Sequence, residues 1–418
     1  MRRTSLLGFL TDKQSAFRHA VRTARRSLRA RAAPYWRRAL WPVTFIAITG
    51  SGGKTTTTAL LGAILSEHGR TKVGIINNTD PAIRETLLRT RPWHRWCVHE
   101  IAADKRGAMA ARVAMFRADV GIVTMIGSDH LSNFRSTDAI AREKGILIER
   151  LARTGVAILN LDDVRVAAMA SRCKGRVITF GCSADADLRA FDVCADWPER
   201  LSFRVAWQGG VVAIRTRLVG AFWLTSVLAA IACALDQGID IAGIAAVVER
   251  FEPIFARNSV HEIAGGPIFI CGTTKAPEAS LQNDIDVIRR AQAPRKTLVL
   301  GNVSDYSGSS SPKYRKAARA AASAGVRVVG VGPNARTVLK VAGEFAPGQI
   351  VAFETCRGAY DFLVADCMAG ELILLKAAAS SHLERLVLNW AKTNRCWKED
   401  CSLKFCISCA FLDNPMPA

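Results

Sequence analysis

Between residues 43 and 181, short apolar runs alternate with longer segments whose apolar residues recur every three or four positions. The runs predict buried strands, and the longer segments predict amphipathic helices. Regular alternation of this kind is typical of a mostly parallel sheet with helices on both faces. Strands are expected at 43–49, 72–77, 96–101, 119–125, 155–160 and 176–181, separated by helices near 54–68, 81–90, 105–117, 137–152 and 163–172.

The pattern changes between about 185 and 217, where apolar and polar residues alternate singly. Two such runs, 201–207 and 211–215, flank a Gln-Gly-Gly turn at 208–210, which is a hairpin signal. We therefore expect a small antiparallel addition to the sheet.

A second α/β alternation follows a segment at Pro253–Arg257 that we interpret as a hinge. The first region closes with helical patterns at 221–236 and 240–250. The second has no G-x-G-x-x-G after its first strand, so a Rossmann-like sheet without a separate dinucleotide site is predicted. Its strands are expected near 267–271, 296–301, 326–331, 350–353 and 371–375, and its helices near 278–292, 313–324, 335–344, 357–368 and 380–393.

Positive charge is concentrated at the N-terminal end of the chain. The formal net charge is +21, and residues 1–40 contain eleven Arg or Lys against a single acid, Asp12. Such a segment is suited to an anionic polymer or a membrane surface, and a solvated helical arm is an equally good interpretation. No specific nucleic acid partner is expected.

The run Leu218–Leu235 has no charged residue over eighteen positions, which is the lower limit for a membrane span. It is rich in alanine and continues the α/β pattern, so a buried helix is predicted instead. The N-terminal arm lacks the apolar core of a signal peptide. We expect a cytoplasmic protein, with peripheral association at the inner membrane face as the alternative.

Twelve cysteines without a secretory signal are typical of free thiols or metal ligands in a reducing compartment. Four of them, Cys396, Cys401, Cys406 and Cys409, lie within fourteen residues of one another. They predict a tetrahedral Zn²⁺ site that pins the tail, although Fe–S ligation is also chemically allowed. Reduced cysteines packed against the C-terminal helix are the structural alternative.

A glycine-rich stretch connects the strand at 43–49 to the next helix. Glycines let backbone N–H groups surround an anion, and a helix N-terminus adds positive potential. A lysine here can reach the β and γ phosphates, and the next threonine can ligate Mg²⁺. Ile48 replaces the first glycine of the usual motif, and a structural glycine turn is the alternative. The nucleotide-binding candidates are Gly50, Ser51, Gly52, Gly53, Lys54, Thr55 and Thr56.

Five segments, in this order, resemble those of the Mur ligase family, the ATP-dependent ligases of peptidoglycan, poly-γ-glutamate and cyanophycin synthesis and folate polyglutamylation. The resemblance covers residues 43–395. It implies that a carboxylate attacks the γ-phosphoryl group of ATP to form an acyl phosphate, and that an amine then displaces phosphate. The segments are Thr49–Thr56, Glu100–Gly107, Ile126–Leu131, Ala141–Gly145 and Leu159–Asp162.

The resemblance implies roles for side chains around the phosphates. Lys54 would hold the phosphates, Thr55 and Glu100 the first Mg²⁺, and His130 the second. Lys144 matches a lysine that many members carry in carbamylated form beside the second ion. From the residues alone, Glu100 ends a predicted strand at the mouth of the sheet. His130 is then a metal ligand or an ordinary loop histidine, and Lys144 is a helix-surface lysine.

Four downstream segments also resemble the family. Leu298–Asp305 resembles a strand and loop, Leu374–Lys376 resembles a later strand end, and the other two carry candidate residues. Phe255–Asn258 resembles the hinge segment whose arginine reaches the nucleotide phosphates, which makes Arg257 a candidate. Ile270–Pro277 resembles the start of the C-terminal domain of the family, which faces the ribose and the incoming amine. Lys275 is therefore a candidate catalytic residue that contacts substrate or phosphate.

The chain departs from the family in three places. Cys271 and Gly272 occupy positions where acidic residues usually bind the ribose. Phe222 and Trp223 replace a His-Asn pair near the adenine, and an aromatic ring can stack on a base without copying those hydrogen bonds. Only about forty residues precede the glycine loop, which favours a shorter, polymer-type ligase over one that binds a UDP-linked sugar.

These observations predict an α/β protein with a P-loop-type, mostly parallel ATPase domain, a smaller Rossmann-like domain and a Cys-rich tail. The expected function is an ATP- and Mg²⁺-dependent ligase that joins a carboxylate to an amino acid or peptide amine in cell-wall or anionic-polymer biosynthesis. The alternative is a degenerate ligase fold that acts as a binding or scaffold protein. The expected divisions are 1–40, 41–252, 253–395 and 396–418.

Overall fold

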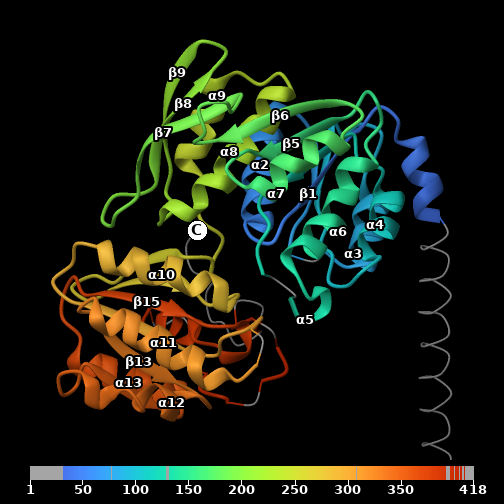
Figure 1. Ribbon diagram of the computed structural model, residues 1–418. Helices are drawn as coiled ribbons and strands as arrows, with labels where there is room; N and C mark the ends of the chain where they lie inside the picture. Colours follow the sequence, from blue (N-terminus) through green and yellow to red (C-terminus); the bar gives the residue numbers. More distant parts are fainter. Residues whose placement is uncertain are drawn as a thin grey trace, which may run out of the picture.

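The chain forms two α/β units, each built on one mainly parallel sheet (Figure 1). The N-terminal unit runs from β1 to α9, and the C-terminal unit from β10 to α14. The computed structural model describes residues 32–76, 78–128, 131–306, 308–391, 396–399, 401–403, 405–406 and 409, without the side chains of 131 and 132.

The sheet of the N-terminal unit has nine strands in the order β2-β3-β1-β4-β5-β6-β7-β8-β9. Strands β2 to β7 are parallel to their neighbours, whereas β7, β8 and β9 pair antiparallel. The predicted mostly parallel sheet with an antiparallel addition is therefore confirmed. The strands are β1 Thr44–Thr49, β2 Thr71–Gly74, β3 Trp96–Glu100, β4 Val120–Val123, β5 Val156–Asn160, β6 Arg176–Gly181, β7 Leu188–Cys194, β8 Ser202–Trp207 and β9 Gly210–Arg215.

Helices cover both faces of this sheet, and each face has its own apolar core. Helices α2, α8 and α9 pack on one face, and α3, α4 and α6 pack on the other. The helices are α2 Lys54–His68, α3 Asp80–Arg89, α4 Ala108–Phe116, α5 Leu131–Phe134, α6 Thr137–Glu149, α7 Val164–Ala167, η1 Ala168–Arg172, η2 Ala221–Trp223, α8 Leu224–Asp236 and α9 Ile241–Arg250.

The uncharged run at 218–235 forms η2 and α8. Helix α8 is only 13 residues long, and its residues from Ser226 to Ala234 are all buried. It packs against α2 across one face of the sheet, which explains why both of its sides are apolar. The buried helix is confirmed, and no helix in the described part of the chain has the length and apolarity needed to cross a bilayer.

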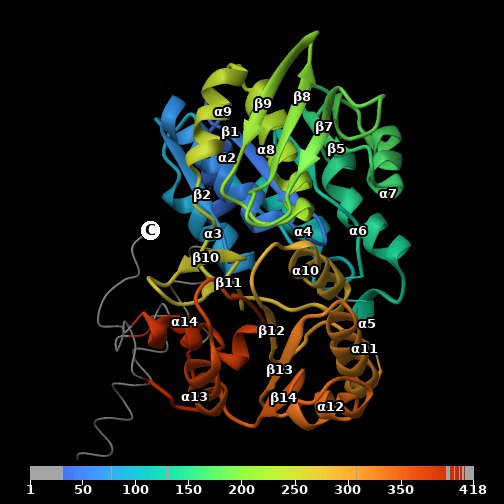
Figure 2. The same cartoon turned by 90° about the vertical axis from the view of Figure 1, so that its left-hand side faces the viewer.

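The C-terminal unit has a six-stranded sheet in the order β10-β11-β15-β12-β13-β14. Only β10 is antiparallel to its neighbour. Helices α10 to α12 lie on one face and α13 and α14 on the other (Figure 2). The elements are β10 Ser259–Glu262, β11 Ile268–Gly272, α10 Glu278–Arg290, β12 Lys296–Leu300, α11 Ser310–Ser323, β13 Arg327–Val331, α12 Ala335–Leu339, η3 Ala342–Glu344, β14 Ile350–Phe353, α13 Cys356–Asp366, β15 Leu372–Lys376, η4 Ala379–Ser381 and α14 Glu384–Trp390.

Two strands, β7 and β10, were not predicted. Strand β7 contains a register shift between Phe191 and Cys194, which interrupts the alternation that marks a strand in sequence. Strand β10 has four residues, of which Ser259, His261 and Glu262 are polar, so its pattern is too short to recognise. The predicted helix at 163–172 is also divided, into α7 and η1.

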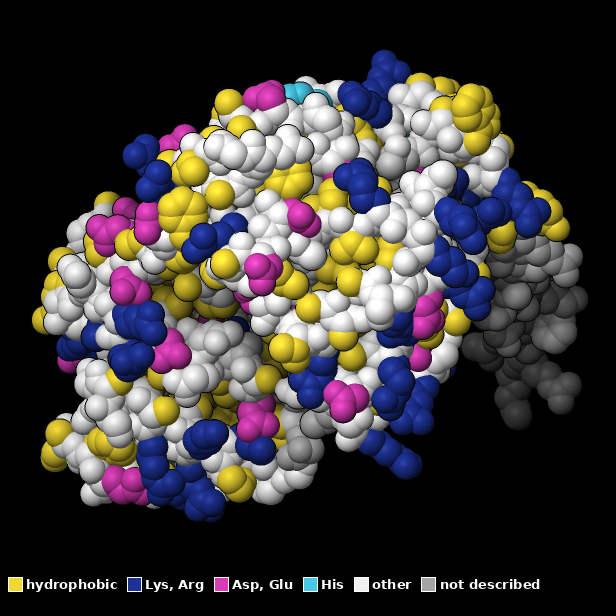
Figure 3. All heavy atoms as spheres, turned by 45° about the horizontal axis from the view of Figure 1, so that its top comes forward, with side chains coloured by type: hydrophobic (Ala, Val, Ile, Leu, Met, Phe, Trp, Pro, Cys, Tyr) yellow, Lys and Arg dark blue, Asp and Glu magenta, His cyan; other side chains and the backbone are white. Residues whose placement is uncertain are grey.

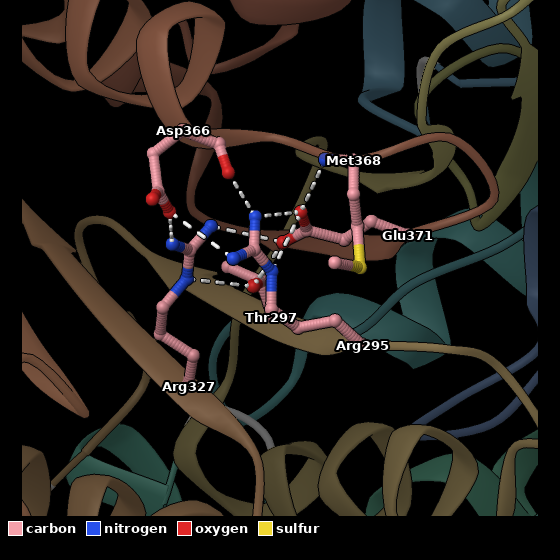
Figure 4. Close-up of polar contacts among 6 residues, drawn as sticks. All are labelled: Arg295, Thr297, Arg327, Asp366, Met368 and Glu371. Atoms are coloured by element: carbon pink, nitrogen blue, oxygen red, sulfur yellow. Dashed lines mark hydrogen bonds and ion pairs between the residues drawn. The ribbon is translucent and has the colours of Figure 1, made fainter.

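A buried ion-pair network ties together the amino ends of β12, β13 and β15 (Figure 4). The carboxylate of Glu371 is fully buried and accepts hydrogen bonds from Arg295, Arg327 and Thr297. Asp366 pairs with both arginines from the outer side. The network lies at the opposite end of the sheet from the carboxyl ends of the strands, which face the N-terminal unit, and it stabilises their registration.

The described part of the basic arm contains the helical residues 32–39. Arg37 is buried there: its guanidinium donates to the carbonyls of Phe116 and Arg117 and pairs with Asp119 at 3.3 Å. It therefore anchors the helix on the N-terminal unit. The remainder of the expected arm, residues 1–31, lies outside the described residues.

Candidate active site

The glycine loop follows β1 directly and is shaped by close approach to two other elements. A Cβ atom on Gly50 would lie 1.9 Å from Thr124 Oγ1, beyond the end of β4, and one on Gly53 would lie 2.4 Å from Ser226 Oγ in α8. Gly53 also has a positive φ of 77° and caps α2. Both positions thus require glycine. The next strand supports the loop as well, because Met125 O accepts a hydrogen bond from Ser51 N at 2.8 Å.

Two lysine side chains reach the same carbonyl of this loop. The Lys54 ammonium donates to Gly50 O at 2.6 Å, and the Lys144 ammonium donates to it at 3.1 Å. Lys144 comes from α6 and is 1% exposed, so the interpretation of this residue as a surface lysine is wrong. Its neighbour Glu143 accepts hydrogen bonds from the backbone of α4, which fixes α6 beside the loop.

Thr55 and Glu100 meet at the carboxyl ends of neighbouring strands. The register places Glu100 of β3 opposite Ile48 of β1, and Thr55 lies in the first turn of α2. The Thr55 hydroxyl donates to Glu100 Oε2 at 2.7 Å, and both residues are buried. A hydroxyl and a carboxylate oxygen in contact form a hard-oxygen donor set of the kind that Mg²⁺ takes in nucleotide sites. The residues present therefore fit that ion.

Arg257 brings a further charged group to this place from the connection between the units. Burial lowers the pKa of its guanidinium, and the negative charge of Glu100 acts in the opposite direction. Its neighbours Ala256 and Asn258 have positive φ values of 62° and 56°, so the expected hinge is a sharply turned segment. The turn aims Arg257 at the glycine-loop end of the cavity.

A cavity of about 270 Å³ lies between the two units. Most predicted site residues line it: Ser51, Gly52, Gly53, Lys54, Thr55, Glu100, Arg257 and Lys275. Lys275 is exposed and lies in the connection between β11 and α10. Thr56 is instead buried within α2 and does not line the cavity. His130 falls outside the described residues, so its predicted role stays a prediction.

The C-terminal unit contributes a polar cluster that sequence reasoning missed. Lys376, at the end of β15, pairs with Asp284 of α10 at 2.7 Å, and Asn258 Nδ2 donates to the same carboxylate at 3.1 Å. All three line the cavity and are buried. The available signal was Asp284 itself, an acid within the apolar stripe that Leu281 and Ile285 form on α10.

The departure at Cys271 and Gly272 has a structural explanation. A Cβ on Gly272 would lie 2.4 Å from Asn258 Oδ1, so the absence of a side chain makes room for Asn258. Cys271 packs in the apolar core on the face of α13 and α14, and burial raises the pKa of its thiol to about 12. The buried acid on this side of the cavity is therefore Asp284 of α10, and neither residue of β11 takes that place.

Phe222 and Trp223 also line the cavity, at the start of α8. Their ring centroids lie 5.0 Å apart with the planes tilted by 46°. Trp223 Nε1 is buried and has no hydrogen-bond partner among the described residues. The wall therefore offers an aromatic face, and the indole N–H lies buried behind it.

The segment Leu159–Asp162 supports the glycine loop indirectly, by a hydrogen bond to Thr124 after β4. Asn160, the last residue of β5, donates from Nδ2 to the carbonyl of Thr124 at 2.9 Å. Thr124 in turn donates to Gly52 O at 2.6 Å. Asn160 thus holds the residue that supports the glycine loop.

The structure does not gather the four tail cysteines into one site. Among the described residues, Cys406 forms a potential ligand group with His382 and Glu384, and the other three cysteines are not part of it. Cys406 is buried against the start of α14, whereas Cys396, Cys401 and Cys409 are only partly buried. The expected four-cysteine arrangement is therefore not present in these parts of the tail.

The middle of the chain matches a known family, the Mur ligase middle domain, over residues 48–234. UDP-N-acetylmuramoyl-tripeptide--D-alanyl-D-alanine ligase of Escherichia coli K12 is 26% identical over 315 residues, which are 74% of this chain and 69% of that protein. The enzyme of the same name from Mycobacterium tuberculosis H37Rv is 31% identical over 214 residues, but these cover 51% of this chain and 42% of that protein.

Solved structures of Mur ligases resemble this chain over most of its length. The crystal structure of MurF from Acinetobacter baumannii superposes with a TM-score of 0.78 and 26% identity, over 88% of this chain and 80% of that one. MurF from Thermotoga maritima, solved with ADP, superposes with a TM-score of 0.74 at 19% identity and so shows the shared fold. By sequence and by structure, residues 48–234 form a Mur ligase middle domain, and the chain as a whole is similar to Mur ligases.

Proposed function

We propose that the protein is an ATP-dependent ligase that joins a carboxylate to an amine through an acyl phosphate. A carboxylate oxygen attacks the γ-phosphorus of ATP, and ADP leaves. The amine nitrogen then attacks the acyl carbon, the C–O bond to the phosphate breaks, and phosphate leaves. The observation that carries this proposal is the buried Thr55–Glu100 pair, which lies beside a glycine loop in a cavity shared by both units.

The phosphate end of the cavity supplies positive charge for this reaction. Lys54 lies at the start of α2 within reach of an anion on the loop, and Arg257 approaches from the connection between the units. Cationic groups fixed before the reaction stabilise charge that develops on transferring phosphoryl oxygens. Mg²⁺, held by Thr55 and Glu100, would neutralise phosphate charge when bound. The second Mg²⁺ expected at His130 is a further part of this proposal.

The other end of the cavity suits the nucleoside. Phe222 and Trp223 offer an aromatic surface on which a base can stack. The carboxylate of Asp284, steadied by Lys376 and Asn258, is the acid on this wall that can accept hydrogen bonds from ribose hydroxyls. It takes the place of the acidic residues that the chain lacks at Cys271 and Gly272.

The substrates belong to two classes, a carboxylate and an amino acid or peptide amine. The names of the E. coli and M. tuberculosis relatives give the first pair to test, a UDP-N-acetylmuramoyl-tripeptide with D-alanyl-D-alanine. Lys275 is suited to contact one of the two substrates, because it is exposed at the cavity wall on the C-terminal unit.

Carbamylation of Lys144 is supported by its surroundings. Its ammonium and that of Lys54 share one carbonyl acceptor, and Lys144 is buried. Two ammonium groups that share one acceptor repel each other, and burial of Lys144 adds a desolvation cost. Conversion of Lys144 to a carbamate would replace one of these cations by a carboxylate, which can also serve as a ligand for the second metal ion.

Phosphate release tests the ligase proposal. ATP hydrolysed by the full-length protein should depend on both the carboxylate and the amine, measured over the named pair and a panel of amino acids and acidic peptides. Lys54→Ala should lower the rate at least about 100-fold, because it removes a charge that acts on the transferring phosphoryl group. Lys340→Ala, an exposed lysine after α12, should leave it unchanged.

Two outcomes would contradict the proposal. One is an absence of turnover with every pair although ATP binds, which would favour a degenerate ligase fold with a binding or scaffold role. The other is turnover that Lys54→Ala and Lys340→Ala lower equally, because the glycine loop would then have no special part in the reaction.

We further propose that the face around residues 32–41 docks on an anionic surface. Tyr35 and Trp41 are 71% and 85% exposed there, and Lys and Arg side chains are numerous on this side of the molecule (Figure 3). Exposed aromatics beside arginine suit the headgroup region of a membrane. Sedimentation with vesicles should show binding to anionic but not zwitterionic lipid, reduced by salt and by a Tyr35→Ser/Trp41→Ser variant. Equal binding to both lipids would refute this.

A further inference from the structure

A second cluster of possible metal ligands lies away from the ATP cavity, at the start of α14. His382, Glu384 and Cys406 are all buried, and their ligand atoms all lie within 4.8 Å of one another. The first two follow β15 and η4 in the chain, whereas Cys406 comes from the tail. The cluster therefore joins the tail to the C-terminal unit.

Two of the three spacings in this cluster match those of a metal-bound set. Cys406 Sγ lies 3.4 Å from His382 Nδ1, and His382 Nδ1 lies 3.6 Å from Glu384 Oε1. Zinc holds N, O and S ligands at roughly 2.0–2.3 Å, so two ligands on a regular tetrahedron are about 3.4–3.7 Å apart. A single ion could be placed among the three atoms with little movement of the side chains.

One carboxylate oxygen in the cluster has no hydrogen-bond partner among the described residues. This oxygen is Glu384 Oε2, which is buried, although Glu384 Oε1 accepts from Cys406 N at 3.1 Å. The Glu384 side chain is only 3% exposed. A buried carboxylate oxygen without a donor is costly, and a bound cation removes that cost.

Arg385 contacts the cluster through Cys406. Its Nε donates to Cys406 Sγ at 3.4 Å, and its guanidinium also donates to the carbonyl of Lys398. A donor of this kind stabilises a thiolate and orients it, as the outer partners of metal ligands commonly do. Trp397 adds a ring contact with Tyr360 of α13 at 4.9 Å. The tail thus packs here through several side chains.

We propose that His382, Glu384 and Cys406 bind one Zn²⁺ ion that fixes the C-terminal tail to the C-terminal unit. Mixed imidazole, carboxylate and thiolate ligands suit zinc better than Mg²⁺ or Ca²⁺, which prefer oxygen alone. Three protein ligands leave the fourth tetrahedral position for water. The ligand set differs from a four-cysteine site, since only Cys406 of the tail takes part.

Zinc content measured by mass spectrometry on the full-length protein tests this assignment. The protein is purified without chelators after growth with added zinc and should retain about one Zn²⁺ per chain. Glu384→Gln and Cys406→Ser, both close in shape to the native residues, and His382→Asn should each lower the zinc content at least about tenfold. Circular dichroism shows whether each variant is folded.

Cys401→Ser and Cys409→Ser are the matched controls and should keep their zinc. Cobalt(II) provides a second readout, because a thiolate ligand gives a charge-transfer band that Cys406→Ser should abolish and Cys401→Ser should preserve. Loss of metal from Cys401→Ser as complete as that from Cys406→Ser would overturn the assignment in favour of a cysteine-only site. A wild-type protein that takes up neither zinc nor cobalt would refute any metal at this place.

Discussion

Lys376 and Asp284 form a 2.7 Å ion pair that joins the carboxyl end of β15 to α10 at the wall of the cavity. Their side chains are 9% and 4% exposed, so the pair is shielded from water. Asn258 donates to the same carboxylate. The pair therefore fixes the geometry of the C-terminal wall before any ligand arrives.

Asp284→Asn should lower the stability of the C-terminal unit and the apparent affinity of the enzyme for ATP. It leaves the Lys376 ammonium buried without its partner, which typically costs about 3–5 kcal/mol. The thermal midpoint should fall, and KM for ATP should rise if Asp284 accepts from the ribose. The control is Asp286→Asn on the same helix. Asp286 pairs with Arg289 and is more exposed than Asp284. An Asp284→Asn enzyme with unchanged KM would argue against the ribose contact.

Gly272→Ala tests whether the missing side chain at this position serves Asn258. The added Cβ would lie 2.4 Å from Asn258 Oδ1, so Asn258 must move, at a cost of about 1–3 kcal/mol. We expect KM for ATP to rise on the order of tenfold with a smaller change in kcat. Gly343→Ala has no atom within 4 Å of the new Cβ and should behave as wild type.

Activity should depend on carbamylation of Lys144. Lys144→Ala should lower kcat at least about 100-fold, because no anion would then face the second metal position. Short carboxylic acids added to this variant should restore part of the rate, and bicarbonate should stimulate the wild-type enzyme after its removal. Lys174→Ala, an exposed lysine before β6, is the control. A Lys144→Ala enzyme with full activity would refute the assigned role.

Glu371→Gln should destabilise the C-terminal unit without a direct effect on the cavity. Glu371 is fully buried between Arg295 and Arg327 (Figure 4), so loss of its charge leaves two cations poorly compensated. We expect a loss of about 3–5 kcal/mol in denaturant unfolding.

The comparison for this change is Glu354→Gln, which breaks an exposed pair with Arg336. Those side chains are 69% and 85% exposed, and the loss should stay below about 1 kcal/mol. Equal losses for Glu371→Gln and Glu354→Gln would show that burial of the network adds nothing to stability.

Stability should fall in mild acid because of His99. Burial lowers the pKa of its imidazole to about 4, and neither ring nitrogen has a partner in the described part of the chain. The unfolded chain takes up this proton near pH 6.5 and the folded chain only near pH 4. Protons therefore favour unfolding between these values, by on the order of 3 kcal/mol at the lower end.

Unfolding by denaturant at several pH values measures this dependence. His99→Gln should flatten the decline between about pH 6.5 and pH 4 relative to wild type, whereas His68→Gln, at the end of α2, should not. An unchanged slope in His99→Gln would assign the decline to other groups, such as His261, whose pKa burial also lowers to about 4.

Much of the fold could be predicted because each strand and helix is short and carries its own pattern. The apolar run at 43–49 and the glycines after it identify β1 and its loop, since a buried parallel strand and a tight turn require those residue types locally. Strand β7 could not be predicted in this way. Its pairing depends on a partner, β8, that tolerates a register shift between Phe191 and Cys194.

The sequence by itself determined the order of elements and the residues of the glycine loop, because spacing within a strand–loop–helix segment fixes Gly50 to Thr55. Only the tertiary structure decided that Lys144 is buried at that loop, that Asp284 lines the cavity and pairs with Lys376, and that Cys406 meets His382 and Glu384. These contacts join residues from different elements. Their partners follow from how sheets and helices pack, which no local pattern encodes.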